Sequence, residues 1–358
     1  MTNIKKIGLT ALAGSLVAAS ATAGEIAVTG SANVTYVTGK DSSAGKGIGT
    51  DKDVAFTGSG ELDNGWTFTV STLLTDAMVV SSSYTSITMG SLGTVSFGAD
   101  TGGASYKYDE EVPQAYEQTS DAQQNSSNIV GNQNDSNMIV YNSPSFDLGG
   151  VSASIDLEYS PNAASTSAPA NDGGSGTASD DFGSATGAGV TLGYDALKVG
   201  VYAAEIERTT PVAAGSDKVR DMFEGVWYAS YSFGPVAIGY SESYLDSGAA
   251  VAAEAITAVK AVRTAGGIFE GQSMSIAFNV NDNLSLSYTT TEDTYNAQSN
   301  VKGGTEIADV TQETDAIQLA YSMGGMSIKA YSMDTSNPGY DDNAADKTAT
   351  EIALGLAF

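Results

Sequence analysis

Apolar and polar side chains alternate along most of this chain. The alternation begins over Ile26–Tyr36, recurs over Val54–Leu62, Phe223–Tyr231 and Met274–Val280, and closes the chain over Ile352–Phe358. Successive side chains of a β-strand point to opposite faces of the sheet, so this pattern predicts strands with one apolar and one polar face. Counting every such segment predicts about sixteen strands.

The connections between these segments fall into two groups. Short turns are expected near residues 63–65, 90–93, 143–150, 195–196, 233–235, 281–283 and 324–325. Long polar segments alternate with them, near residues 39–52, 76–83, 99–135, 160–187, 207–220, 243–271, 290–313 and 333–348. One edge of the sheet would therefore carry tight turns and the other long loops, as in an antiparallel barrel of an outer membrane.

A soluble β-sandwich alternates in the same way, with its apolar faces packed into a core. Three features favour the all-β transmembrane barrel over the sandwich. The loop lengths differ strongly between the two edges, and many apolar positions near strand ends are aromatic, such as Tyr36, Trp66 and Tyr240. The last strand also ends on an aromatic residue, Phe358. Aromatic residues are enriched at both membrane–water interfaces, although they are also good strand formers in general.

Composition removes several classes of function. The 358 residues include 42 Asp and Glu, 15 Lys and Arg, and no histidine or cysteine, which gives a formal net charge of −27. A basic surface for nucleic acids is excluded by this balance. The lack of His and Cys excludes a Ser-His-Asp triad, a thiol nucleophile, a disulfide framework and an ordinary zinc site. We expect no enzyme.

The N-terminus has the features of a secretory signal. Lys5 and Lys6 precede the apolar stretch 7–19, and small residues at Ala21 and Ala23 fit a cleavage site. The expected division is a signal peptide over 1–23 and a barrel domain over 24–358; an amphipathic first helix of a cytosolic protein is the alternative. After residue 23 no apolar stretch reaches the roughly 20 residues of a spanning helix.

Three segments resemble the general porins of Gram-negative outer membranes, and the trimeric alphaproteobacterial porins in particular. They are Ser91–Gly98 (SLGTVSFG), Tyr141–Phe146 (YNSPSF) followed by Gly149 and Gly150, and the terminal strand Glu351–Phe358. The resemblance implies a homotrimer of sixteen-stranded barrels, each a passive channel for small hydrophilic solutes and ions. It also implies a location among outer-membrane lipid and lipopolysaccharide, and makes Phe358 part of an assembly signal for the barrel-assembly machinery.

In that family the third loop folds into the lumen, and its acidic residues face bases on the wall. The matching segment, 99–134, carries a set of charged residues: Asp100, Lys107, Asp109, Glu110, Glu111, Glu117 and Asp121. By alternation, a second set points inward from the wall: Asp53, Glu61, Asp156, Glu158, Lys198 and Lys329. No arginine precedes Arg208, so the family's basic cluster on the early strands is missing. We therefore expect a pore that prefers cations; an acidic, solvated surface loop is the alternative for 99–134.

Some alternatives stay open. Residues 249–264 are Ala-rich and form either a helix inside a long loop or an irregular segment. The carboxylates of 172–181 and 341–346 either bind Ca²⁺ or are simply solvated, and no other cofactor is expected. For function, the alternatives to a porin are a barrel adhesin with a plugged lumen and a secreted acidic surface-layer protein.

Overall fold

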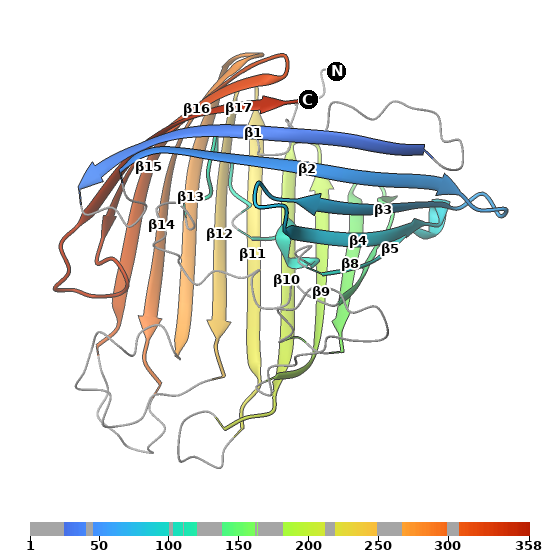
Figure 1. Cartoon of the computed structure of the whole chain (residues 1–358). Coiled ribbons are helices and arrows are strands. Elements are labelled where there is room, and N and C mark those ends of the chain that lie inside the picture. The colour runs from blue at the N-terminus through green and yellow to red at the C-terminus, as the bar shows by residue number, and fades with distance from the viewer. Residues whose placement is uncertain are drawn as a thin grey trace.

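The computed structural model describes residues 25–40, 46–99, 103–109, 111–119, 138–161, 163, 182–211, 219–248, 267–298 and 308–358. In this part of the chain, seventeen strand segments form one antiparallel sheet (Figure 1). They are β1 (Glu25–Lys40), β2 (Gly47–Glu61), β3 (Thr67–Leu74), β4 (Val80–Thr88), β5 (Thr94–Ala99), β6 (Met138–Asn142), β7 (Phe146–Asp147), β8 (Ser152–Ser160), β9 (Phe182–Tyr194), β10 (Leu197–Arg208), β11 (Met222–Phe233), β12 (Val236–Asp246), β13 (Ile268–Asn281), β14 (Leu284–Asn296), β15 (Val310–Met323), β16 (Met326–Ser336) and β17 (Lys347–Ala357).

Two of these segments are parts of one barrel strand. Both β6 and β7 pair with β8, and the residues between them include Pro144, which has no backbone N–H for the ladder. Ser143 covers the interruption, because its amide donates to the Ile155 carbonyl (2.9 Å) and its Oγ accepts from the Ile155 amide (2.7 Å). The described chain thus has sixteen barrel strands, and the predicted number is confirmed.

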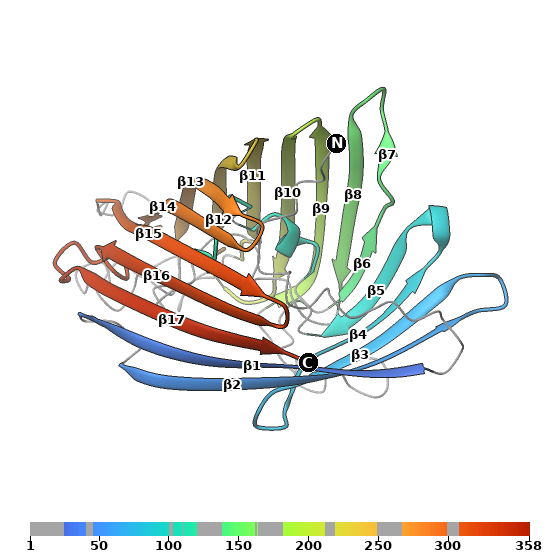
Figure 2. The same ribbon diagram turned by 90° about the horizontal axis from the view of Figure 1, so that it is seen from above.

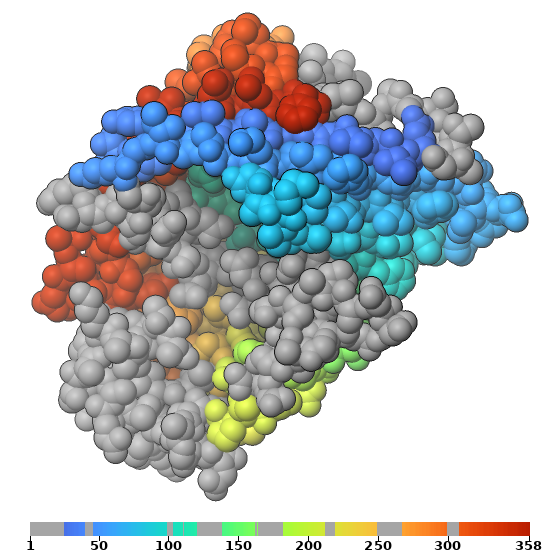
Figure 3. All heavy atoms as spheres, in the orientation of Figure 1, coloured from blue at the N-terminus to red at the C-terminus, as the bar shows by residue number. Residues whose placement is uncertain are grey.

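The sheet closes between its first and last strands. β1 pairs with β2 on one side and with β17 on the other, from Ser31 opposite Ala357 to Lys40 opposite Thr348. Beyond the last paired residues, Gly30 and Phe358 exchange two backbone hydrogen bonds of 2.8 and 3.0 Å. The view from above shows the ring of strands around the interior, and the space-filling view shows β1 and β2 against β17 (Figure 2, Figure 3).

The two faces of the sheet differ as the alternation predicts. Large apolar side chains point outward and are exposed, among them Ile26 (71%), Ile317 (65%) and Ile276 (50%). The intervening side chains point inward and are mostly small or polar; Gln318, next to Ile317, is only 1% exposed. A sandwich would bury the apolar face, so the observed closed barrel excludes that alternative. Outward apolar side chains need hydrocarbon around them.

Aromatic side chains pair along the outer face of β11 and β12. Tyr231 stacks on Phe233 (6.1 Å between ring centroids) beside the turn between the two strands. Trp227 packs against Tyr240 at 5.4 Å in the middle of the strands, and Phe223 lies 6.2 Å from Tyr244 near their opposite end. Outward aromatic residues near both ends of a strand are what the two interfaces of a membrane favour.

Two of the predicted long connections are short. The segment predicted as a loop over 39–52 is mostly strand, because β1 continues to Lys40 and β2 begins at Gly47. The loop predicted over 76–83 is wrong as well: a turn over 75–79 leads directly into β4, closed by a bond from the Met78 amide to the Thr75 carbonyl (2.8 Å). In both places polar residues belong to strands, because the inner face of a barrel strand meets water. Polarity alone therefore makes the loops look longer than they are.

Several expectations fall outside the described residues. They are the signal peptide over 1–23, the helix or irregular segment over 249–264, and the first acidic loop over 172–181. Where the structure describes the chain, no helix is both long and apolar enough to cross a membrane.

Contact with hydrocarbon can be tested by placing one charge on each face. We expect Ile276→Lys, in the middle of β13, to lower the free energy of unfolding by about 2–4 kcal/mol, because lysine at the bilayer midplane loses its hydration. Asn33→Lys is the control, since Asn33 lines an interior cavity. The measurement is denaturant unfolding in lipid vesicles; equal losses for both variants would contradict an outward face in lipid.

Candidate functional site

The third loop, between β5 and β6, crosses the inside of the barrel. Its described residues are 103–109, with the short 3₁₀ turn η3 (Ser105–Lys107), and 111–119. In chain order they contact residues on β8, β10, β12, β14, β15 and β17. The loop therefore runs along the inner wall from the middle of the sheet to its last strand.

The first part of the loop is held by two buried carboxylates of β8. The Ala104 amide donates to Glu158 Oε2 at 2.6 Å, and Glu158 also accepts a hydrogen bond from the Tyr202 hydroxyl. Asp156 receives Lys107 Nζ at 2.5 Å and the Tyr108 hydroxyl at 2.8 Å. Asp156 is 1% exposed, and a buried charge is tolerated when it is paired and hydrogen-bonded in this way.

Tyr108 packs this part of the loop against the wall. Its ring stacks on Tyr202 (5.4 Å between centroids) and lies 6.2 Å from that of Tyr228. A Cβ on Gly189 would come within 2.4 Å of the Tyr108 ring, so the wall needs glycine there. Burial raises the pKa of the Tyr108 hydroxyl well above its usual value, which keeps it a donor to Asp156.

The middle of the loop contacts β10 and β12. Lys198 Nζ lies 2.7 Å from Glu111 Oε2 and 4.9 Å from the centre of the Tyr228 ring. Val112 and Pro113 lie over Gly239, where a Cβ would come within 2.4 Å of Pro113 Cδ. This close approach leaves little space between the loop and the wall at β12.

The last described part reaches the strands near the closure. The Ala115 amide donates to Ser287 Oγ (2.9 Å), and the Tyr116 hydroxyl donates to Glu351 Oε1 (2.6 Å). Lys329 Nζ lies 5.0 Å from the centre of the Tyr116 ring. Burial and the bond to Glu351 raise the pKa of the Tyr116 hydroxyl, so it remains protonated.

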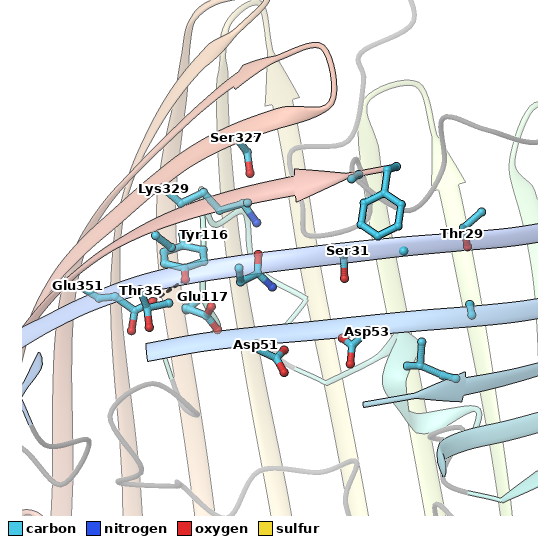
Figure 4. Close-up of a pocket in the computed structure, with 18 residues that line it drawn as sticks. Thr29, Ser31, Thr35, Asp51, Asp53, Tyr116, Glu117, Ser327, Lys329 and Glu351 are labelled. Carbon is cyan, nitrogen blue, oxygen red and sulfur yellow. Dashed lines mark hydrogen bonds between the residues drawn. The ribbon is translucent and has the colours of Figure 1, made fainter. Parts of the chain in front are cut away.

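An interior cavity of about 540 Å³ remains between this end of the loop and the wall (Figure 4). Its polar lining comes from four strands and the loop: Thr29, Ser31, Asn33, Thr35, Asp51, Asp53, Tyr116, Glu117, Ser327, Lys329 and Glu351. Asp51 and Asp53 line it from β2, Glu117 from the loop and Glu351 from β17 (Figure 4). Four acidic side chains and one lysine line the cavity, for a formal charge of 1 − 4 = −3.

The residues predicted for the site fall into separate places. Five are contacts between loop and wall: Lys107, Glu111, Asp156, Glu158 and Lys198. Three line the cavity: Asp53, Glu117 and Lys329.

The others lie elsewhere. Asp109 accepts a hydrogen bond from Gln118 through its carbonyl (3.1 Å), within the loop, and Glu61 is exposed at the end of β2. Asp100, Glu110 and Asp121 are outside the described residues. Phe358 lies at the closure, bonded to Gly30.

Several residues of this site were not predicted from the sequence, among them Asp51, Glu351, Tyr108 and Tyr116. Asp51 and Glu351 share the inward alternation of Asp53 and Ala353, so the pattern contained the signal for both. Tyr108 and Tyr116 have no such signal, because the path of an irregular loop does not follow from periodicity.

The second acidic loop shows local turns. Asp341 Oδ1 accepts the amide of Asn343 (3.1 Å), and Asp342 Oδ1 accepts the Asn343 side chain (2.7 Å). Among the described residues, no three acidic side chains converge as metal ligands would.

Comparison with known proteins gives one family. The family model described as Gram-negative porin matches residues 8–358. A comparison with curated proteins finds no match.

Solved porin structures share the fold at low identity. OmpF of Salmonella typhi, solved with daunomycin, has a TM-score of 0.66 and 10% identity, over 94% of this chain and 98% of that one. The anion-selective porin of Comamonas acidovorans has a TM-score of 0.61 and 14% identity, over 94% and 100%. OmpT of Vibrio cholerae in its trimer form has a TM-score of 0.59 and 12% identity, over 94% and 100%.

The family match spans nearly the whole chain, and the closed sixteen-stranded barrel agrees with it. The chain therefore belongs to the Gram-negative porins, which are channel proteins of the outer membrane.

Proposed function

We propose that this porin is a cation-preferring channel for small hydrophilic solutes, and that its third loop forms the constriction. The observation that carries the proposal is the formal charge of −3 on the cavity beside the loop. Rings of acidic side chains select cations, because fixed negative charge attracts cations and repels anions.

The pairing of charges supports this reading. Lys107 pairs with Asp156 and Lys198 with Glu111, so each loop charge in these pairs is compensated by an opposite charge of the wall. These two pairs lie away from the cavity lining. The field in the cavity then comes mainly from Asp51, Asp53, Glu117 and Glu351, with Lys329 as the one opposing charge there.

The fold by itself does not decide selectivity. The porin of Comamonas acidovorans is described as anion-selective and shares this fold at 14% identity. Selectivity therefore depends on side chains that vary between porins of the same architecture. In this chain, Asp51 and Asp53 lie on one of the early strands, where the sequence lacks the family's basic cluster.

The assembly belongs to the same proposal. We expect a homotrimer embedded in outer-membrane lipid and lipopolysaccharide, in line with the trimer form of the Vibrio cholerae protein. Phe358 is proposed as part of the signal read by the barrel-assembly machinery. Its backbone is bonded to Gly30, so the terminal strand completes the closure. Passage is passive, and no catalytic step is proposed.

Planar-bilayer recording tests the channel itself. We expect purified protein to give stepwise conductance and, under a KCl gradient, a reversal potential of the sign for K⁺ over Cl⁻. Absence of conductance from folded, heat-modifiable protein would favour a barrel adhesin with a plugged lumen. Release from cells into buffer without detergent would favour a surface-layer protein, and an anion preference would contradict the charge argument.

Neutralising the β2 acids tests which residues carry the preference. The double variant Asp51→Asn, Asp53→Asn changes the cavity from −3 to −1. One unit charge about 4 Å from an ion contributes about 1 kcal/mol in water, or about fivefold in ion occupancy. We therefore expect the K⁺/Cl⁻ permeability ratio to fall several-fold. Glu61→Gln, at the exposed end of the same strand, is the control and should leave the ratio unchanged.

A further inference from the structure

Gln318 is a buried polar residue in the middle of β15. Its neighbour Ile317 points outward and is 65% exposed, whereas Gln318 points inward and is 1% exposed. A side-chain amide has two donors and an acceptor that need partners when it is removed from water. Within the described part of the chain, the side chain of Gln318 hydrogen-bonds to residues of the third loop.

The amide of Gln318 bonds two backbone groups of the loop at once. Its Oε1 accepts the Tyr116 amide at 2.7 Å, and its Nε2 donates to the Glu117 carbonyl at 2.7 Å. Nε2 also lies 3.4 Å from Gln114 Oε1, which accepts both the amide and the hydroxyl of Thr119. One side chain thus supplies the loop backbone with both an acceptor and a donor, as a neighbouring strand does in a sheet.

The position of these bonds links Gln318 to the cavity. Tyr116 and Glu117, the residues whose backbone it holds, are the two loop residues in the cavity lining. The other contacts of this part are made by side chains: the bond from the Ala115 amide to Ser287, the Tyr116–Glu351 bond, and the packing of the Tyr116 ring beside Tyr331 (5.8 Å between centroids) and Lys329 Nζ (5.0 Å). Gln318 is the wall residue that bonds the backbone of both Tyr116 and Glu117. The first half of the loop, by contrast, is fixed by buried carboxylates and ion pairs.

We propose that Gln318 is the positioning residue of the constriction, which fixes Tyr116 and Glu117 at the edge of the cavity through a two-point bond to their backbone. The inference rests on the proposed function, since it assigns the width and charge of the channel to this end of the loop. Without Gln318, two partly buried backbone groups lose their partners, and the loop end keeps only its side-chain contacts with the wall and moves toward solvent.

Two substitutions separate the parts of this contact. Gln318→Met keeps the length of the side chain and removes both bonds. Gln318→Glu keeps the shape and the acceptor for Tyr116, but it replaces the donor to Glu117 with an oxygen. We expect both variants to form heat-modifiable barrels with a higher single-channel conductance than the unmodified protein. In Gln318→Met the reversal potential also shifts toward zero, because Glu117 is no longer held at the cavity.

Gln312 provides a matched control on the same strand and the same face. It is also 1% exposed, but its Oε1 accepts the amide of Gly339, in the connection between β16 and β17. Gln312→Met should leave conductance and reversal potential unchanged. A general loosening of the barrel would change the conductance of Gln318→Met and Gln312→Met alike. The control therefore separates an effect on the position of the loop from an effect on the stability of the barrel.

The outcomes are distinct. Conductance and reversal potential like those of the unmodified protein in Gln318→Met would overturn the inference, as would an equal change in Gln312→Met. Failure of both Gln318 variants to fold would overturn it as well, because Gln318 would then serve the barrel rather than the loop. If the unmodified barrel does not conduct, the proposed function fails instead.

Discussion

The barrel depends on backbone hydrogen bonds between its own strands, because the surrounding hydrocarbon offers no hydrogen-bond partners. Hydrocarbon provides no partner for a free N–H or C=O, so a sheet in a membrane is stable only when its first and last strands pair. The β1–β17 ladder and the two bonds between Gly30 and Phe358 meet this requirement. The break at Pro144 meets it locally, through the backbone and hydroxyl of Ser143.

Closure also creates the interior in which the third loop lies. The loop has no strand beside it, so its buried backbone groups find partners on wall side chains: Glu158, Ser287 and Gln318. Each part uses a different kind of contact. Buried carboxylates, ion pairs and stacked tyrosines fix the first part. Bonds from Ser287 and Gln318 to the loop backbone fix the part beside the cavity, together with the Tyr116–Glu351 bond. Beside the described end of the loop, the cavity has its polar lining on β1, β2, β16 and β17.

Charge is distributed in two ways inside this barrel. Where loop and wall touch, opposite charges pair and their fields largely cancel at a distance. Where the cavity is open, carboxylates of β2, β17 and the loop outnumber the single lysine. Related porins share the architecture at 10–14% identity, and one of them is described as anion-selective. The barrel architecture alone therefore does not fix the charges on its inner wall.

The alternation of apolar and polar positions was sufficient to predict a barrel of about sixteen strands and the inward or outward direction of strand residues. Direction follows from a period of two, which holds along any strand and needs no knowledge of its neighbours; Asp51 and Glu351 were accessible to the same rule. Which side chains meet inside the barrel could not be predicted in this way. Lys107 meets Asp156, 49 residues away, and Gln318 meets Tyr116 across 202 residues. Such contacts depend on the path of an irregular loop through a closed interior, and that path is set by packing against all the strands together rather than by any local pattern.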